Sequence, residues 1–408
     1  MGAIPWWLLL LILSNLVLWP FFALILTATL GALAARPRRS EGDGPEARFL
    51  VVIPAHDEAA GIAATIRSCQ AFHYPADRFE VLVIADNCSD ETAAIARREG
   101  ATVLERFDSL RKSKGYAIED MIEWLRKTGQ FGQFDAIVII DADSLADPGL
   151  LRCFARVLRD GHDWIQCLYT VSNPDASWRT RLLTYAFSLF NGVFPLGLSQ
   201  VGLSASFRGN GMCFSRAGLE RVPWQSRGLV EDLEFSWVVR TAGERIAFVA
   251  DAGVSGEMVV RGGAAAAAQR KRWEFGRREL RRKFLWPLLR SQRLGGLQKL
   301  AALLELVFPS MVTLVVSYLV VGCINLIAIG SVPSILSFPG RVFLLASTLF
   351  MTLTLGLYAV SPFFVLRLPW VYALSLGYFP IYAGWKFAVA LGEKPVHWVR
   401  TARNSADR

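Results

Sequence analysis

The chain has 408 residues, of which 53% are hydrophobic and 19% are charged, and its formal net charge is +9. Soluble domains average about 25% charged residues, so this composition excludes a wholly soluble globular protein, and the apolar content excludes a disordered one. The six cysteines are scattered singly and no C-x-x-C occurs. The sequence therefore contains no motif for a structural zinc site.

A long charge-free stretch opens the chain. Thirty uncharged residues run from Pro5 to Ala34, and the first charged residue is Arg36. At 1.5 Å per helical residue this stretch can cross a hydrocarbon core of about 30 Å, whereas a signal peptide has a charged start and a shorter apolar region. We therefore expect a transmembrane anchor over residues 1–35. The arginines that follow it place the next segment in the cytoplasm by the positive-inside rule.

Beyond a polar linker (residues 36–47), the composition becomes that of a globular domain, over residues 48–260. Short apolar runs at Phe49–Pro54, Phe79–Ala85 and Ala136–Ile140 predict buried strands, and segments with helical patterns separate them. This alternation predicts an α/β fold with a mostly parallel sheet and helices on both faces. The domain would be inserted between transmembrane helices.

Three further apolar stretches lie in the C-terminal part, at Leu306–Gly340, Val342–Leu366 and Leu368–Trp385. We expect transmembrane and interface helices over residues 300–392 and a basic tail over residues 393–408. A basic tail favours the cytoplasm. The prediction is therefore two full C-terminal spans, with Trp370–Leu391 lying along the interface or re-entering the membrane.

The excess positive charge is confined to residues 261–299, whose net charge is +10. At about 100° per residue, Trp273, Leu280 and Phe284 share one helix face and Arg282 lies nearly opposite. The pattern predicts an amphipathic helix that binds membrane lipids at the interface, with an ordinary solvated basic helix as the alternative. A nucleic-acid partner is not expected, because the charge lies beside a span and the globular part has no basic stripe.

Each of the three predicted strands is followed by carboxylates, at Asp57–Glu58, Asp86 and Asp141–Asp143. Ligands of open α/β sheets bind at the carboxyl ends of the strands. Asp141 and Asp143 are two apart on an extended segment, so both can approach one Mg²⁺ or Mn²⁺ ion. For a D-x-D in isolation, the alternative is a helix cap plus a surface aspartate. No P-loop and no G-x-G-x-x-G follows a strand, which argues against nucleotide hydrolysis and hydride transfer.

Two polar motifs lie downstream. Glu231 and Asp232, in LVEDLEFS, stand at a predicted helix start, where helix capping is the alternative to a catalytic role. Gln269, Arg272 and Trp273, in QRKRW, share one helix face. An amide and a guanidinium suit phosphate oxygens, and an indole suits a sugar ring.

The segments VVIPAHDE, VLVIADNCSDET, KSKGYA, IVIIDADS, GNGMCFSR, LVEDLEFS and QRKRW occur in this order along the chain. In order and spacing they resemble the membrane-bound family 2 glycosyltransferases. This group includes the synthases of cellulose, chitin, hyaluronan and poly-N-acetylglucosamine, and lipid glucosyltransferases. The likeness covers about Phe49 to Phe284. The chain departs from the usual T-E-D at Val230, and from the usual D-D or D-G at Asn87.

The resemblance implies a nucleotide-diphospho-sugar transferase domain with a metal-dependent site. The residues implied to contact the donor nucleotide are Asp57, Glu58, Asp86, Lys114 and Asp141. Those implied to hold the divalent metal are Asp141 and Asp143, and those on the diphosphate are Gln269 and Arg272. Those implied at the acceptor are Trp273, Glu231, Gly209 and Asn210. Asp232 resembles the general base that takes the acceptor proton.

The implied reaction is inverting transfer from a UDP-sugar, which gives a β-linked product from an α-linked donor. We expect a growing exopolysaccharide as acceptor, with a membrane lipid that receives one or a few sugars as the alternative. Four apolar segments are few for a single-chain channel, so a polymer product implies a homo-oligomer or an export partner. A non-enzymatic membrane protein is disfavoured by the intact acidic set. The expected location is the bacterial-type inner membrane, with the catalytic domain in the cytoplasm.

Overall fold

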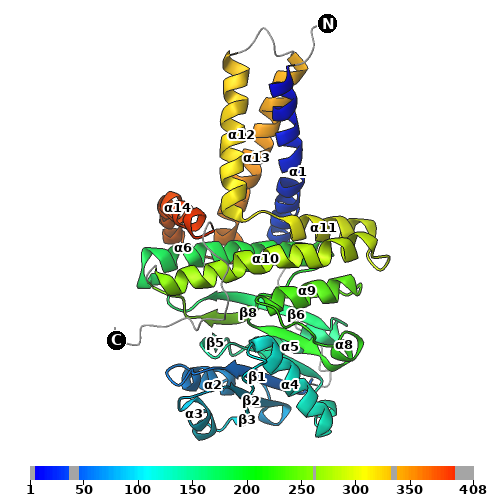
Figure 1. The fold of residues 1–408 in the computed structure, drawn as a ribbon, viewed down its shortest axis with the longest axis vertical. Coiled ribbons are helices and arrows are strands. Elements are labelled where there is room, and N and C mark those ends of the chain that lie inside the picture. Colours follow the sequence, from blue (N-terminus) through cyan, green and yellow to red (C-terminus); the bar gives the residue numbers. More distant parts are fainter. Residues whose placement is uncertain (1–4, 36–45, 261–262, 332–337, 391–408) are drawn as a thin grey trace.

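The structure, a computed structural model, describes residues 5–35, 46–260, 263–331 and 338–390. The molecule is elongated, with a bundle of long helices at one end and a β-sheet with its covering helices at the other (Figure 1). A layer of helices, among them α6, α10 and α11, runs across the long axis between these two parts. Most of the predicted linker and all of the basic tail lie outside the described residues.

One sheet of eight strands forms the centre of the globular part. The strands are β1 (Phe49–Ala55), β2 (Phe79–Asp86), β3 (Thr102–Arg106), β4 (Ala136–Ile139), β5 (Ser144–Ala146), β6 (Trp164–Val171), β7 (Met212–Ser215) and β8 (Ile246–Gly256). Their order in the sheet is β3-β2-β1-β4-β7-β6-β8-β5. The three predicted strands correspond to β1, β2 and β4, and β1 pairs in parallel with both of the others.

The sheet is mixed: four of its strand pairings are parallel, β6 with β8 among them, and three are antiparallel. Strand β7 runs antiparallel to both β4 and β6, and β5 runs antiparallel to β8. The paired segments of β7 and β5 are only four and three residues long. A run this short carries no readable period, and the direction of a strand depends on its neighbours in the fold.

Both faces of the sheet are buried, which follows from the alternation of side chains along β1. Phe49, Val51 and Ile53 point into a core shared with α2 and α5. Leu50 and Val52 point into the opposite core, which contains α4 and α9 and continues into the membrane-type helix α1. The globular part and the helical bundle therefore share one hydrophobic core.

The α-helices vary widely in length. They are α1 (Trp6–Leu33), α2 (Ile62–Gln70), α3 (Thr92–Arg98), α4 (Lys114–Lys127), α5 (Leu150–Arg159), α6 (Trp178–Phe187), α7 (Phe194–Gln200), α8 (Arg216–Arg221), α9 (Glu231–Thr241), α10 (Ala264–Arg290), α11 (Gly296–Val307), α12 (Met311–Ser331), α13 (Phe338–Val365) and α14 (Phe379–Ala390). Shorter helical segments of other types are η1 (Ala76–Arg78), η2 (Phe131–Gln133), η3 (Pro174–Ala176), η4 (Ser188–Val193) and η5 (Trp370–Tyr378). Helix α2 begins at Ile62, five residues after Asp57, so Asp57 is not its cap.

Four helical segments of the described chain are long and apolar enough to cross a membrane, by length and composition. Three of them, α1, α12 and α13, form the bundle in Figure 1. The fourth, Trp178–Gln200, is 83% buried inside the protein, so it packs as an internal helix here. The segment predicted to lie along the interface forms η5 and α14, and neither has the length of a span.

The basic helix α10 uses its apolar face to pack on the protein. Leu280 and Phe284 are each 5% exposed, in a cluster with Val230 and Trp237 beside α9 and Leu306 of α11. The predicted face is therefore apolar and buried, but its described partners are neighbouring helices. Figure 1 shows α10 perpendicular to the bundle, at the level where the bundle ends.

Candidate active site

The carboxylates expected at the strand ends do meet at one edge of the sheet. Strand β1 leads directly to His56 and Asp57, β2 ends at Asp86, and β4 leads to Asp141. Because β1 lies between β2 and β4 in parallel register, these three ends are neighbours.

Asp57 connects the loop after β1 to the loop after β2 by hydrogen bonds. Its carboxylate accepts hydrogen bonds from the backbone amide of Ser89 (2.6 Å) and of Asp90 (3.2 Å), and its backbone adopts a positive φ of 54°. Burial alone would raise the pKa of Asp57, but the hydrogen bonds from Ser89 outweigh it and lower that pKa. Glu58 follows, and its backbone amide donates to the hydroxyl of Thr92 (2.8 Å).

Side chains able to bind a metal also gather here. Asp57, Cys88 and Asp90 place one ligand atom each within 4.8 Å of one another. Asp57 and Asp90 already accept backbone hydrogen bonds in this turn, which accounts for their closeness without an ion.

Asp86 is held at the end of β2 by a buried arginine. Its Oδ1 accepts from Nη1 of Arg106 at 2.6 Å and from the Asn87 amide at 2.7 Å. Arg106 in turn donates to Asp120 (2.6 Å). Burial raises the pKa of Asp86, although the Arg106 guanidinium acts against that shift. The carboxylate is thus fixed in direction, with 8% of the residue exposed toward solvent.

Lys114, the first residue of α4, bridges two parts of the site. Its ammonium donates to the carboxylate of Asp141 and to the carbonyl of Gly209. Burial would lower the pKa of Lys114, but Asp141, Glu231 and other nearby carboxylates raise it. The lysine is therefore a charged group that ties the D-x-D segment to the G-N-G turn.

Asn210 is fully buried in the turn, and its expected contact with an acceptor stays a prediction. Its Oδ1 accepts from the Asp141 amide (3.1 Å) and its Nδ2 donates to Ser144 Oγ (2.7 Å). The neighbouring Gly209 has a φ of 82°, and a Cβ there would lie 3.2 Å from Oδ2 of Asp232. The turn therefore brings the D-x-D segment next to the predicted base.

The D-x-D residues suit a hard cation. Asp141 is 32% exposed at its side chain, and Asp143 accepts a hydrogen bond from Ser144 Oγ at 2.9 Å. Both side chains carry carboxylate oxygens, which are the ligands that Mg²⁺ and Mn²⁺ prefer. The residues present therefore fit a divalent metal.

Glu231 and Asp232 stand at the start of α9, as predicted. Burial, and then the charge of Asp232, raises the pKa of Glu231 to about 7. Burial likewise raises the pKa of Asp232, against the effects of the Leu233 amide and the cations Lys114, Arg272 and Arg208. A partly buried carboxylate pair among cations is typical of a functional site.

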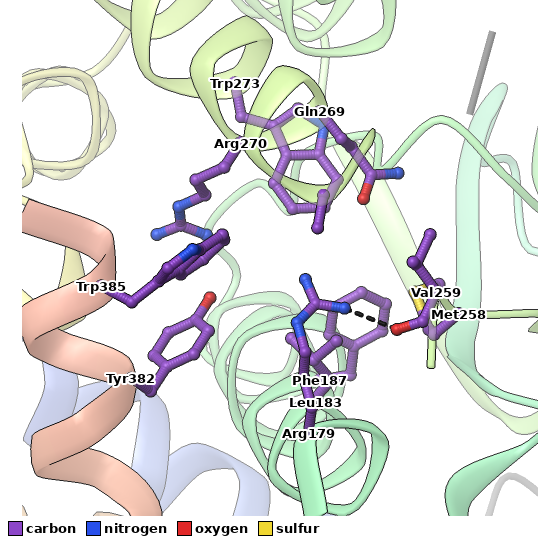
Figure 2. Close-up of a pocket in the computed structure, with 11 residues that line it drawn as sticks. Arg179, Leu183, Phe187, Met258, Val259, Gln269, Arg270, Trp273, Tyr382 and Trp385 are labelled. Carbon is purple, nitrogen blue, oxygen red and sulfur yellow. Dashed lines mark hydrogen bonds between the residues drawn. The ribbon is translucent and has the colours of Figure 1, made fainter. Parts of the chain in front are cut away.

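The side chains of the Q-x-x-R-W motif lie in two different surroundings. Arg272 acts electrostatically on both Glu231 and Asp232, and its buried Nε has no hydrogen-bond partner within the described chain. Gln269 and Trp273 line a pocket between α6, α10 and α14 instead (Figure 2). The diphosphate role expected for Gln269 stays a prediction.

Two residues near Asp232 were missed. Tyr169, near the end of β6, is influenced electrostatically by Asp141 and Asp232, and burial raises its pKa well above the ordinary value. Arg208, just before the G-N-G turn, faces Asp232 and Glu305, and burial lowers its pKa. In the sequence, the only signs of a role for these residues were a tyrosine within an apolar strand and an arginine within an apolar loop. Their position near Asp232 follows only from the fold.

The comparisons with known proteins agree with this geometry. Residues 45–276 match the family described as Glycosyltransferase like family 2. A probable glycosyltransferase of Bacillus subtilis, YdaM, is 25% identical over 258 residues, which are 60% of this chain and 58% of that protein. The beta-monoglucosyldiacylglycerol synthase of Trichormus variabilis is 28% identical over 233 residues, which are 55% of this chain and 49% of that protein. The chain thus spans about half the length of these curated relatives.

Among solved structures, the mannosyltransferase PcManGT from Pyrobaculum calidifontis, in complex with GDP-Man and Mn²⁺, has a similar fold. The TM-score is 0.50 at 16% identity, over 86% of this chain and 97% of that one. The family match covers more than half of the sequence. The chain therefore belongs to the glycosyltransferase-like family 2, and its mixed α/β sheet has a GT-A-like nucleotide-sugar transferase fold.

Proposed function

We propose that this chain is an inverting, metal-dependent glycosyltransferase that moves a sugar from a UDP-sugar to a membrane lipid. One observation carries the proposal: Asp232 lies beside the Gly209 turn, with Lys114 and Arg272 acting on it. A base and the cations that a diphosphate requires thus meet at the edge of the sheet where such folds bind ligands.

The donor would lie across the ends of β1, β2 and β4. Asp57, Glu58 and Asp86 would hold the uridine, since the first and third are already fixed in direction by hydrogen bonds. Lys114 and Arg272 would face the diphosphate, because guanidinium and ammonium groups match phosphate oxygens.

Asp141 and Asp143 would hold the divalent metal. Bound there, the ion supplies positive charge that stabilises the diphosphate as a leaving group. The ion pair between Lys114 and Asp141 keeps this carboxylate turned toward the donor side.

Asp232 would take the proton from the acceptor hydroxyl. A general base contributes roughly 10²–10⁴-fold to a rate. The cations around Asp232 favour its ionised form and so act against the effect of burial on its pKa. With one base and direct displacement, the configuration at the anomeric carbon inverts.

The helical bundle favours a lipid over a growing polymer as the acceptor. Its interior is filled where Asn15, Asn325 and Ser347 meet, and each of these residues is 0% exposed. Asn15 exchanges hydrogen bonds of 3.1 and 3.0 Å with Asn325 and accepts one of 2.6 Å from Ser347. Three helices packed in this way leave no channel for a sugar chain at this level. The similarity to a glycolipid synthase supports the same choice.

The test is incubation of the purified chain, in lipid nanodiscs with Mg²⁺ or Mn²⁺, with radiolabelled UDP-sugars. We expect label in the lipid extract as a species carrying one or a few sugars, and none with the Asp232→Asn variant. A labelled polymer would refute the lipid acceptor. The absence of any transfer from every UDP-sugar, while UDP is bound, would refute the proposed reaction.

A further inference from the structure

A pocket lies between α6, α10 and α14, and its polar groups point into one shared space (Figure 2). The guanidinium of Arg179 from α6, the guanidinium of Arg270 and the amide of Gln269 from α10, and the hydroxyl of Tyr382 from α14 face this space. Trp273 forms part of the wall.

Arg179 is a buried cation without an acidic partner. The residue is 7% exposed, and Nη1 donates to the carbonyl of Val259 at 2.6 Å. The guanidinium also lies 5.6 Å from the ring centre of Trp385. Within the described parts of the chain, no carboxylate pairs with it. A buried charge without a counter-charge is costly, which indicates that an anion completes this site.

The neighbouring charges are also unbalanced. Three cations form ion pairs with a single carboxylate oxygen, Oε1 of Glu274. They are Arg270 (3.2 Å), Arg277 (2.8 Å) and Lys386 (3.4 Å). The side chain of Lys386 is 5% exposed. Burial, and then the charge of Arg270, lowers the pKa of Lys386 to about 7.

Positive charge exceeds negative charge in this cluster. Arg277 Nη2 and Lys386 Nζ both contact the one oxygen Oε1 of Glu274, and the buried Nε of Arg270 makes no hydrogen bond within the described chain. Among the described residues, Glu274 pairs with three of the four cations, and Arg179 instead donates to the carbonyl of Val259. Arginine forks and an ammonium are the groups that recognise phosphate oxygens.

The surface beside the pocket is apolar. In η5, Trp370 is 59% exposed and Leu374 is 77% exposed, and in α14, Ile381 is 61% exposed and Phe387 is 42% exposed. These elements belong to the layer at the level where the bundle ends (Figure 1). A cationic pocket next to exposed apolar and aromatic side chains suits a ligand with a charged head and acyl chains.

We propose that this pocket binds the phosphate group of an anionic phospholipid headgroup. Arg179 and Arg270, which both line the pocket, would contact the phosphate oxygens, and the acyl chains would lie along η5 and α14. The site adjoins the candidate active site, because the ring of Tyr169 lies 5.5 Å from that of Phe187 in the pocket wall. The assignment holds whichever molecule receives the sugar.

The test is a titration of the purified full chain with three probes, followed by native mass spectrometry. The probes are phosphatidylglycerol, diacylglycerol with the same acyl chains, and inorganic phosphate. We expect phosphatidylglycerol to bind and the other two to bind at least about tenfold more weakly, since each lacks one of the two recognised parts. Arg179→Gln and Arg270→Gln should each weaken binding of phosphatidylglycerol by about ten- to a hundredfold.

The matched control is Arg152→Gln, which removes the same charge from an exposed position of α5 and should leave binding unchanged. If Arg179→Gln does not fold, Arg270→Gln and Arg179→Lys are used for the test, and Arg179→Lys should retain part of the affinity. Equal binding of diacylglycerol, equal binding of inorganic phosphate, or pocket variants that bind like the parent protein would overturn the proposal. No UDP-sugar is present, so these outcomes are independent of the proposed transfer reaction.

Discussion

At the scale of single residues, Asp232 is the position on which the proposed chemistry depends. Asp232→Asn keeps the size of the side chain and removes the proton acceptor. We expect the transfer rate to fall by roughly 10²–10⁴-fold while UDP binding, measured by calorimetry, changes little. A variant that loses UDP binding together with activity, while still folded, would contradict the assignment as base. Asp143→Asn provides the contrast, because it should weaken metal-dependent UDP binding.

Glu231 provides a second prediction at this scale, through pH. Burial and the adjacent Asp232 raise its pKa from 4.5 to about 7 in the folded protein. A carboxyl group whose pKa is raised by folding stabilises most below pH 4.5, and this contribution is lost as the pH rises to about 7.

Between pH 5 and pH 8, the parent protein should therefore lose on the order of 1–3 kcal/mol more stability than Glu231→Gln. Thermal unfolding in detergent at several pH values, without metal or donor, measures this difference. Parallel pH profiles for the two proteins would show that Glu231 keeps an ordinary pKa.

At the scale of elements, α1 and α7 approach each other through small residues. A Cβ at Gly197 would lie 1.6 Å from the carbonyl oxygen of Ala28, and Gly31 makes a similarly close approach from α1. Backbones pack this closely only where side chains are absent. The contact joins the first bundle helix to the helices above the sheet (Figure 1).

Gly197→Ala should therefore force α7 away from α1 and destabilise the protein by about 1–3 kcal/mol. Gly356→Ala is the control, because no atom lies within 4 Å of a Cβ at that position of α13. Differential scanning fluorimetry of both variants in detergent checks the expectation. An unchanged unfolding temperature for Gly197→Ala would mean that this contact does not hold the two helices together.

At the scale of the whole molecule, three bundle helices with the sheet at one end predict the orientation in the membrane (Figure 1). From the arginines after α1 we expect the sheet in the cytoplasm by the positive-inside rule, so the distal end of α12 should face outward. In a cysteine-free background, an impermeant maleimide should label Ser331→Cys in intact cells, and Gln133→Cys only after permeabilisation. Both positions are exposed. The reverse pattern would contradict the orientation.

Some elements of the site could be predicted from the sequence, and others could not. The strand ends at Asp57, Asp86 and Asp141 could be located because β1, β2 and β4 are apolar runs that carboxylates follow, and β1 pairs in parallel with the other two. The antiparallel direction of β7 could not be predicted, since it is set by pairing with β4 and β6. Tyr169 and Arg208 became visible only when the sheet brought distant loops together.

The amino-acid sequence by itself determined the local features of this protein. These are the long apolar stretches that form α1, α12 and α13, the carboxylates after the strands, and the concentration of positive charge in α10, because each depends only on neighbouring residues. The tertiary structure decided which of these groups meet. It directed Arg272 toward Glu231 and Asp232, and Gln269 and Trp273 toward the pocket with α6 and α14. The physical reason is that the direction of a side chain on a helix is fixed by what packs against that helix, and in α10 this comes from segments far apart in the chain.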